Sequence, residues 1–392
     1  MIIETHERIP IKSWCNNPEE GAMAQARNLA NLPFAFHHVA LMPDTHQGYG
    51  CPIGTVAAME DVVIPFLVGV DIGCGMLSVR TSLTDISVSV LELIVAEIYK
   101  RIPVGFNHQS IPCDETEIPY MWHTVGTDQE LEYPVISEEF ERARFQLGTL
   151  GGGNHFIEIQ RGSDGFIWFM IHSGSRNLGF KVAHYYNELA VELNAKWVSS
   201  IPKECELAFL PIDSDEAHQY LREMTYCLDF AQRNRESMAT VIKEIISDNI
   251  SDCKFDKEIN IHHNYVALEN HFGKNVWVHR KGATSAKSGE MGIIPGSQGT
   301  SSYIVQGLGN VNSFTSCSHG AGRAMGRKEA KRTLSLEDEQ AIMNKQGIIH
   351  NLTEMNLDEA PSAYKDIDIV MEEQKDLVEI VVKLEPLACV KG

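Results

Sequence analysis

The sequence lacks several features that mark common classes of protein. No apolar run reaches the roughly 18 residues that a membrane-spanning helix needs, so we expect no membrane segment. The first residues show no basic stretch followed by an apolar one, so we expect no signal peptide. The nine cysteines follow no paired pattern, which favours reduced thiols and a cytoplasmic location. The sequence also has no repeat, no low-complexity tract and no Pro/Ser-rich linker, which argues against separate modules.

Positive charge is scarce as well. The 33 Lys and Arg against 53 Asp and Glu give a formal net charge of −20, which by itself argues against a nucleic-acid-binding protein. Residues 274–332 differ, because they carry nine basic and two acidic side chains, a local charge of +7. This excess predicts a basic face for a phosphate-bearing ligand. A solvated helix after Gly322 would explain the basic side chains of residues 328–332 about as well.

The pattern of apolar residues predicts a mixed α/β (α+β) fold. Apolar runs between Gly-rich turns predict strands, including a hairpin over 156–173 and a last strand over 377–383. Residues 104–134 are predicted to be mostly loop. Helical periodicity predicts helices over 18–31, 90–103, 137–147, 178–198, 214–247, 320–333, 336–346 and 365–374. The polar motif residues come from turns along most of the chain, so we expect one integrated domain.

Metal-binding side chains recur in short Gly-rich turns. Asp71 and Cys74 lie in VGVDIGCGM, His155 in GGGNHFIE, His172 in MIHSGSR and His263 in IHHNYV. Glycine lets the backbone turn sharply, and Asp, Cys and His bind borderline divalent metals. Each histidine alone is more often a satisfied core residue, and Cys74 alone more often a buried thiol. Their occurrence together favours a metal site, and the ligand types favour zinc.

Another group of residues suits phosphate chemistry. His319 lies in SHGAGR, before a predicted helix whose N-terminus would offer free N–H groups to a phosphate. A neutral imidazole there can accept a phosphoryl or nucleotidyl group. The turn PGSQGTSS at 295–302 can cradle phosphates, although it lacks the ending of a Walker A loop. Arg176 suits a bidentate phosphate contact, with a surface ion pair as the alternative. The residues alone therefore predict a metal-dependent enzyme acting on a phosphate ester or anhydride.

Ten motifs, in order along nearly the whole chain, resemble the RtcB family of RNA ligases, with the bacterial members most similar. They are MPDTHQGYG (42–50), VGVDIGCGM (68–76), LGTLGGGNHFIEI (147–159), HSGSR (172–176), HHNYV (262–266), RKGA (280–283), IIPGSQG (293–299), CSHGAGR (317–323), AYKDID (363–368) and CVKG (389–392). The resemblance implies a single domain over residues 1–392, with mixed sheets flanked by helices and the active site in a central cleft. It also implies two Mn²⁺ ions and GTP as cofactors.

The resemblance also implies a role for individual residues. The metal ligands would be Asp71, Cys74, His155, His172 and His263, with Cys74 shared between the ions. His319 would be the catalytic residue that accepts GMP. Glu158 would accept guanine N1–H and N2–H, and Lys391 would donate to O6, which would disfavour adenine. The complete guanylate pocket would be Asn154, His155, Phe156, Ile157, Glu158, His263, Asn264, Pro295, Gly296, Ser297, Gln298, Ser302, His319, Gly320, Ala321, Gly322 and Lys391.

The implied reaction joins an RNA 3′-phosphate or 2′,3′-cyclic phosphate end to a 5′-hydroxyl end, in RNA repair or tRNA splicing. It would pass through a histidine–GMP intermediate and an RNA 3′-pp-5′G end. Asp44, His46, Arg176 and the Lys and Arg of 280–332 are the candidates to hold the RNA ends. An archease-type activator is a candidate partner.

The chain departs from the family pattern at four positions. Gln298 stands where Met is usual, Gly152 where Thr is common, Asn177 where Gly is usual and Gly326 where Ser is common. None of them is a proposed metal ligand or nucleophile, so they bear on substrate preference.

Two other functions use part of the same residues. A metal-dependent RNA-end phosphoesterase would need the metal site but not His319, Glu158 and Lys391 as a set. A catalytically idle RNA-repair subunit would need neither the metal site nor that set of three residues. The presence of all the ligands and of that set argues against both.

Overall fold

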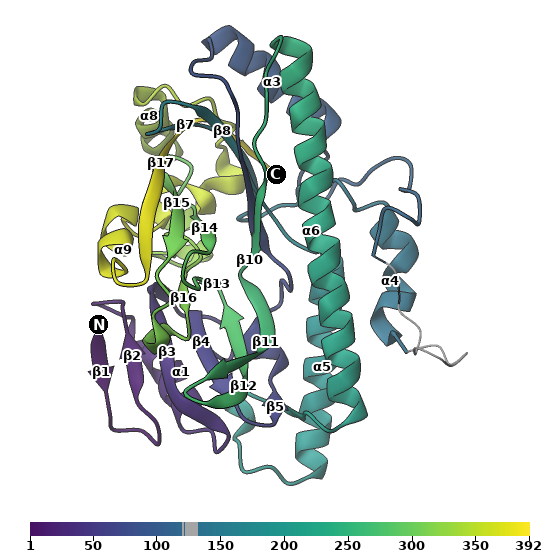
Figure 1. Ribbon diagram of the computed structural model, residues 1–392, viewed down its shortest axis with the longest axis vertical. Coiled ribbons are helices and arrows are strands. Elements are labelled where there is room, and N and C mark those ends of the chain that lie inside the picture. Colours follow the sequence, from purple (N-terminus) through teal and green to yellow (C-terminus); the bar gives the residue numbers. More distant parts are fainter. Residues whose placement is uncertain (120, 122–131) are drawn as a thin grey trace.

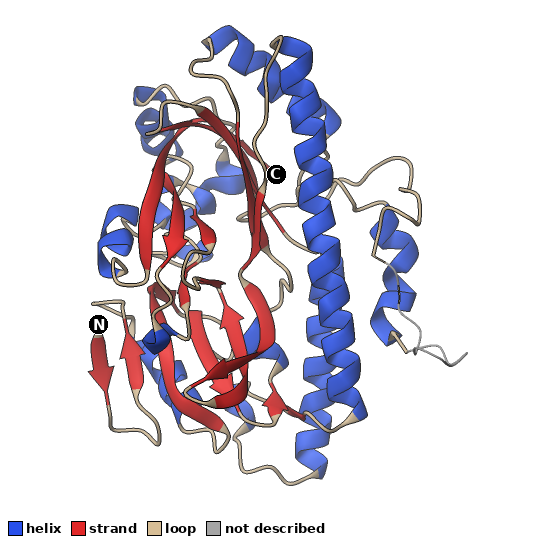
Figure 2. Ribbon diagram, in the orientation of Figure 1, coloured by secondary structure: helices blue, strands red, loops and turns tan. Residues whose placement is uncertain are grey.

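Two β-sheets form the centre of the computed structural model, which describes residues 1–119, 121 and 132–392 (Figure 2). One sheet contains, in spatial order, β1 (Ile2–Glu4), β2 (Ile11–Ser13), β3 (Ala35–His46), β4 (Ile53–Met59), β12 (Lys274–Lys281) and β11 (Asn264–His271). The other contains β10 (Ile259–His262), β6 (Gly75–Arg80), β8 (Ile167–Ser173), β7 (Phe156–Gly162), β17 (Val378–Lys391), β15 (Ser302–Gly307) and β14 (Met291–Ile294). The second sheet curls so that its edge strands β10 and β14 lie against each other.

Helices flank the sheets. The long helix α6 (Asp215–Asn249) runs beside both sheets and packs on β6, β8 and β10 (Figure 1). Helices α3 (Val88–Arg101) and α5 (Asn177–Lys196) pack on α6, and α4 (Pro134–Arg144) packs on α5. Helix α2 (Pro65–Val68) lies between α5 and β12, while α1 (Glu20–Ala30) and α9 (Ile367–Glu373) contact β3. None of the described helices combines the length and the apolar character needed to cross a lipid bilayer.

Short elements connect these layers. Two small strand pairs join β13 (Ala283–Ser285) to β16 (Ser316–Ser318) and β5 (Val62–Val63) to β9 (Leu210–Pro211). The remaining elements are α7 (Arg327–Thr333), α8 (Leu336–Lys345), η1 (Lys203–Cys205), η2 (Val311–Ser313), η3 (Glu354–Glu359) and η4 (Pro361–Ala363).

Local sequence explains the elements that carry the site. The Ser214 hydroxyl accepts a hydrogen bond from the Ala217 N–H and caps α6, and two acidic residues follow in its first turn. Strand β8 is buried along its whole length, which is why its sequence is an almost continuous apolar run. The predicted hairpin is confirmed, because β7 and β8 pair antiparallel on either side of Gly162 to Gly165.

The mixed α/β class is confirmed, but two predicted elements are wrong in extent. The helix predicted over 320–333 begins only at Arg327. Gly322 has a φ of +73°, a conformation that a right-handed helix cannot contain. The strand predicted to end at 383 continues to Lys391. Its pairing with β7 is irregular between Pro386 and Ala388 but resumes from Ala388 to Lys391. The loop predicted over 104–134 is irregular up to α4 where described, and its residues 120 and 122–131 lie outside the described residues.

Candidate active site

The five predicted metal ligands come together at one end of four adjacent strands. Asp71 and Cys74 lie in the turn that leads into β6, and His155 directly precedes β7. His172 lies in β8, and His263 joins β10 to β11. The spatial order β10-β6-β8-β7 makes these strands neighbours, so residues nearly 200 positions apart in sequence share one site.

The ligand atoms form two overlapping groups. Asp71, Cys74 and His155 form one group, and Cys74, His172 and His263 form the other; within each group the atoms lie within 4.8 Å of one another. The Cys74 Sγ lies 3.5 Å from His155 Nε2 and 3.3 Å from His172 Nε2. The Asp71 Oδ2 lies 3.2 Å from His155 Nε2. Cys74 belongs to both groups, so its sulfur would be a ligand common to both if each group held an ion.

The protonation states of the histidines suit metal binding. The Nδ1 atoms of His155 and His172 lie 3.0 Å and 3.1 Å from the carbonyl oxygens of Leu150 and Asn154. A carbonyl only accepts, so each Nδ1 carries the proton and each Nε2 keeps its lone pair for an ion. Burial lowers the pKa of His172 and His263 well below the ordinary value, so both rings are neutral. The buried Nδ1 of His263 has no hydrogen-bond partner among the described residues.

The acidic members of the group also fit an ion. Burial, followed by the charge of Asp71, raises the pKa of the Cys74 thiol well above its ordinary value. A bound metal ion reverses that preference, because a coordinating thiol is deprotonated. Burial opposes ionisation of Asp71, but its contacts with the His155 ring and the Cys74 thiol and the charge of Arg176 keep its pKa below the usual value. The donor set therefore fits two divalent ions, although the ligand types do not distinguish manganese from zinc.

Two polar residues of α6 hold the turns that carry these ligands. Asn234 accepts hydrogen bonds from the N–H groups of Gly148 and Thr149, ahead of His155. The Arg235 guanidinium donates to the carbonyl oxygens of Gly73 at 3.1 Å and Ser173 at 2.9 Å, next to Cys74 and His172. Both side chains are fully buried. Sequence reasoning missed them, and the available signal was an Asn-Arg pair on the mostly apolar face of a long helix.

His319 lies beside the metal group and is oriented by a buried carboxylate. Its ring centroid is 4.8 Å from that of His263. The Asp44 Oδ2 accepts from His319 Nδ1 at 2.7 Å and from the His319 and Gly320 backbone N–H groups at 3.1 Å and 3.3 Å. Burial opposes ionisation of Asp44, but its interaction with the His319 side chain and the charge of Lys365 outweigh burial, and the pKa stays below the usual value. Nδ1 of His319 is thus the protonated nitrogen, and Nε2 keeps the nucleophilic lone pair.

The surroundings of His319 differ from those that the sequence predicted. Asp44, a predicted RNA-end residue, is fully buried against His319, and its contact with an RNA end stays a prediction. His319 follows the short strand β16 and does not precede a helix, because α7 begins only at Arg327. The group that orients His319 is therefore the Asp44 carboxylate, which also accepts from two backbone N–H groups. The helix N-terminus that the sequence predicted for binding a phosphate is not formed there.

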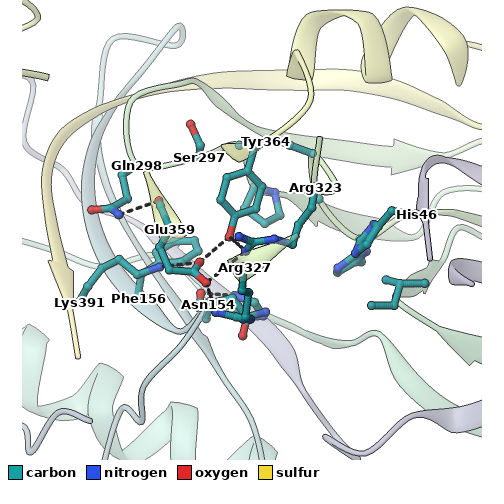
Figure 3. Close-up of a pocket in the computed structure, with 18 residues that line it drawn as sticks. His46, Asn154, Phe156, Ser297, Gln298, Arg323, Arg327, Glu359, Tyr364 and Lys391 are labelled. Carbon is teal, nitrogen blue, oxygen red and sulfur yellow. Dashed lines mark hydrogen bonds and ion pairs between the residues drawn. The ribbon is translucent and has the colours of Figure 1, made fainter. Parts of the chain in front are cut away.

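A cavity opens between His319 and the end of β17 (Figure 3). Its lining includes these predicted pocket residues: Asn154, Phe156, Pro295, Gly296, Ser297, Gln298, His319, Gly320, Ala321, Gly322 and Lys391. His46, a predicted RNA-end residue, and His172 also line it. Arg323 and Arg327 come from the predicted basic segment. Sequence reasoning missed Ile53, Glu359 and Tyr364; Tyr364 falls in the AYKDID motif, but nothing in the sequence marked Glu359.

The other predicted pocket residues are not among those that line the cavity. Burial raises the pKa of Glu158 to about 8, and its Oε2 accepts from Gln160 Nε2 at 2.7 Å. The Asn264 amide ties the Asp71 carbonyl to the Gly282 N–H. The Ser302 hydroxyl accepts from the Gly296 N–H at 3.2 Å. These residues, with His155, Ile157 and His263, support the cavity wall, and their contacts with a nucleotide stay predictions.

The basic segment 274–332 does not form one face. Arg280 is buried and paired with Glu269, and Lys274 pairs with Glu60. Arg323, Arg327 and Lys331 pair with Asp358 or Glu359. Arg176 donates to Thr149 Oγ1 at 2.9 Å and to the Gly105 carbonyl at 3.0 Å. Most of these cations are thus held by groups from elsewhere in the chain.

Comparison with known proteins identifies the family of this chain. The family model described as tRNA-splicing ligase RtcB matches residues 25–392. The chain is 39% identical to the RNA-splicing ligase RtcB of Escherichia coli K12, over 99% of this chain and 98% of that protein. It is 33% and 31% identical to the tRNA-splicing ligases RtcB of Nanoarchaeum equitans and Thermococcus kodakarensis, in each case over 95% of this chain and 92% of the relative. The chain therefore belongs to the RtcB family of RNA ligases.

Proposed function

We propose that this protein joins RNA ends with GTP as its energy source and His319 as the acceptor of GMP. Its family membership makes it an RNA ligase that serves RNA repair or splicing. The observation that carries the proposed chemistry is the pair of His319 and the buried carboxylate of Asp44, at 2.7 Å, beside a cluster of five metal ligands.

The first step uses the geometry at His319. Its Nε2 lone pair attacks the α-phosphorus of GTP while the bond to the pyrophosphate oxygen breaks, which leaves a phosphoramidate and pyrophosphate. The ring then carries a positive charge, which the adjacent Asp44 carboxylate stabilises. Burial lowers the pKa of His46 to about 4, so this neighbour is neutral and adds no competing charge.

The cavity residues would bind the nucleotide. Phe156 offers an aromatic face, and the Lys391 ammonium can donate to guanine O6. The turns over 295–298 and 320–322 present backbone groups to the phosphates. The cavity lining has an excess of positive charge, because it contains Arg323, Arg327 and Lys391 and the carboxylate of Glu359. This excess suits a triphosphate.

Two Mn²⁺ ions would be held by Asp71, Cys74, His155, His172 and His263. Bound there, they would neutralise charge on the phosphoryl oxygens next to His319. Nothing in the donor set conflicts with this assignment.

The later steps transfer the activated group to RNA. An RNA 3′-phosphate oxygen attacks the phosphorus of the His319 adduct, the P–N bond breaks, and the 3′ end becomes 3′-pp-5′G. A 5′-hydroxyl then attacks the RNA phosphorus and releases GMP. A 2′,3′-cyclic phosphate is first hydrolysed to a 3′-phosphate. The nine free cysteines suit the reducing cytoplasm, and an archease-type activator stays a predicted partner.

Incubation with α-³²P-labelled GTP and Mn²⁺, followed by a denaturing gel, tests the proposal. We expect an acid-labile label on the native protein and none on His319→Ala. His218→Ala, which changes an exposed histidine of α6, is the matched control and should label normally. If the native protein binds metal and opens a 2′,3′-cyclic phosphate but takes no label, the ligase mechanism is wrong and the phosphoesterase function replaces it.

A further inference from the structure

The carboxylate of Glu359 is the centre of a hydrogen-bonded cluster in the cavity wall (Figure 3). Its Oε1 accepts from Arg323 Nη1 at 3.2 Å and from Arg327 Nη1. Its Oε2 accepts from Lys391 Nζ at 3.2 Å and from the Tyr364 hydroxyl. All five residues line the cavity, and the Glu359 side chain is 1% exposed. No step of the proposed reaction uses this carboxylate directly.

The four donors saturate Glu359. A carboxylate has about four lone-pair sites, and each is occupied. Glu359 is therefore not available to bind a nucleotide itself while these contacts last. Its effect on a ligand must act through the donors that it holds.

The charge of Glu359 is permanent under ordinary conditions. Burial alone would raise its pKa, but the charges of Lys391 and Arg327 and the hydrogen bond from Tyr364 outweigh it and lower the pKa to about 2. Three cations contact this anion, and Arg327 also pairs with Asp358. Removal of Glu359 would therefore leave Lys391 and Arg323 without the carboxylate that neutralises them.

The backbone of Glu359 is fixed as well. Gln298 Nε2 donates to the Glu359 carbonyl oxygen at 2.8 Å, which ties η3 to the phosphate-binding turn at 295–298. Only the amino group of an amide can donate to a carbonyl, so this contact determines how the amide is oriented. Gln298 is one of the positions that depart from the family pattern, where methionine is usual. The usual methionine could not make this hydrogen bond.

Lys391 depends most on this arrangement. It is the last residue of β17, opposite Phe156, and its Nζ lies 6.0 Å from the Phe156 ring centroid. A lysine side chain has four rotatable bonds and a single charged group at its tip. Among the described residues, Glu359 is the only side chain that holds this ammonium.

We propose that Glu359 is a positioning residue that sets base selection by holding the Lys391 ammonium where it meets the 6-oxygen of guanine. This inference rests on the proposed function and deepens it. Guanine presents an acceptor at position 6, whereas adenine presents an amino group that the ammonium repels. Loss of Glu359 should therefore weaken the preference for a nucleotide with an acceptor at position 6. A lower amount of active protein would not change this preference.

The test measures guanylylation of His319 with three nucleotides: GTP, 6-thio-GTP and ITP. Sulfur is a weak acceptor, so 6-thio-GTP perturbs the contact with Lys391. ITP keeps the 6-oxygen and lacks only the 2-amino group. We expect the native protein to prefer GTP over 6-thio-GTP by about ten- to hundredfold in kcat/KM, the range for a hydrogen bond to a charged group.

In Glu359→Gln the preference for GTP over 6-thio-GTP should fall to about threefold or less, mainly through a higher KM for GTP. The preference for GTP over ITP should not change. Glu359→Asp, which keeps the charge, should recover part of the selectivity. In a Lys391→Met background, Glu359→Gln should have no further effect on the 6-thio-GTP ratio, because both changes remove the same contact.

Glu269→Gln is the matched control. Glu269 is a partly buried carboxylate with a pKa of about 2 that holds an arginine, Arg280, but it lies outside the cavity lining. Its variant should keep the native selectivity.

The outcomes separate the two proposals. If the native protein takes no label from any of the three nucleotides, the proposed function fails and the inference fails with it. If the native protein is labelled and Glu359→Gln loses activity equally with all three nucleotides, only the positioning role is refuted.

Discussion

Replacement of Asp44 by asparagine tests the proposed activation of His319 most directly. The side chain keeps its shape, so the fold should persist, but the charge next to the imidazole disappears. Asp44 Oδ2 accepts three hydrogen bonds, one of them from His319 Nδ1 at 2.7 Å. Its other oxygen, Oδ1, is buried and has no partner among the described residues. Asparagine must place its oxygen at one of these two positions and its amino group at the other.

The two orientations bracket the expected loss. If the amide oxygen replaces Oδ2, the hydrogen bond to His319 becomes neutral, which costs about 1–2 kcal/mol, or roughly five- to thirtyfold in rate. If the amino group faces His319, it forces the proton from Nδ1 to Nε2 and removes the nucleophilic lone pair. A change of tautomer of this kind in a catalytic imidazole costs up to ~10⁴-fold. We therefore expect a fall of about fivefold at least in the rate of guanylylation.

Rapid-quench measurement of the label on His319 at saturating GTP gives this rate. The KM for GTP should stay within about twofold, because Asp44 does not line the cavity and its loss affects only the transition state. Asp376→Asn is the control, since Asp376 accepts from Trp14 and Asn310 away from the site. A native labelling rate in a well-folded Asp44→Asn protein would refute the orienting role of this carboxylate.

Two further changes test the metal group and the cavity wall. In Gly174→Ala the added Cβ would lie 2.6 Å from Asp71 Oδ1, so we expect the affinity for Mn²⁺, measured by calorimetry, to fall about 10- to 100-fold. Gly326→Ala is the control, because its added Cβ would meet no atom within 4 Å. Unchanged binding would show that Asp71 is not a ligand. The pKa of Glu158 is about 8 in the folded protein against 4.5 for an exposed glutamate, so its stabilising contribution is complete below pH 4.5 and is lost as the pH rises through 8. We expect Glu158→Gln to remove this loss. Between pH 5 and 8.5 the free energy of unfolding of the native protein should fall by several kcal/mol relative to that of the variant. If urea denaturation gives the same pH dependence for both proteins, the assignment is wrong.

The structure brings together predicted ligands that stand where chemistry and local geometry coincide. Asp71, Cys74 and His155 each stand in a Gly-rich turn, and such turns are local features that sequence patterns describe. Their side chains also have few roles other than metal binding when they occur together. The pairing order β10-β6-β8-β7, which brings the turns into contact, was not readable from one sequence.

Residues that act through tertiary contacts were not predictable. Asn234, Arg235 and Glu359 lie in helical segments without a motif, and their importance depends on which backbone or side chain packs against them. The predicted helix over 320–333 failed for a related reason. Helical periodicity after His319 was real, but the φ of +73° at Gly322 excludes a helix there, and the chain turns towards Asp44 instead.

Charge gave the least reliable guide, and the structure shows why. The net charge of −20 argued against a nucleic-acid partner, and the excess over 274–332 predicted a basic face. Neither quantity describes the site, because Arg280 and Lys274 are neutralised by Glu269 and Glu60. The cations that line the cavity come from two distant parts of the chain, residues 323–327 and the end of β17, and they meet around one carboxylate. The field that a bound phosphate experiences is therefore set by this convergence, and the sum of charges along a segment does not predict it.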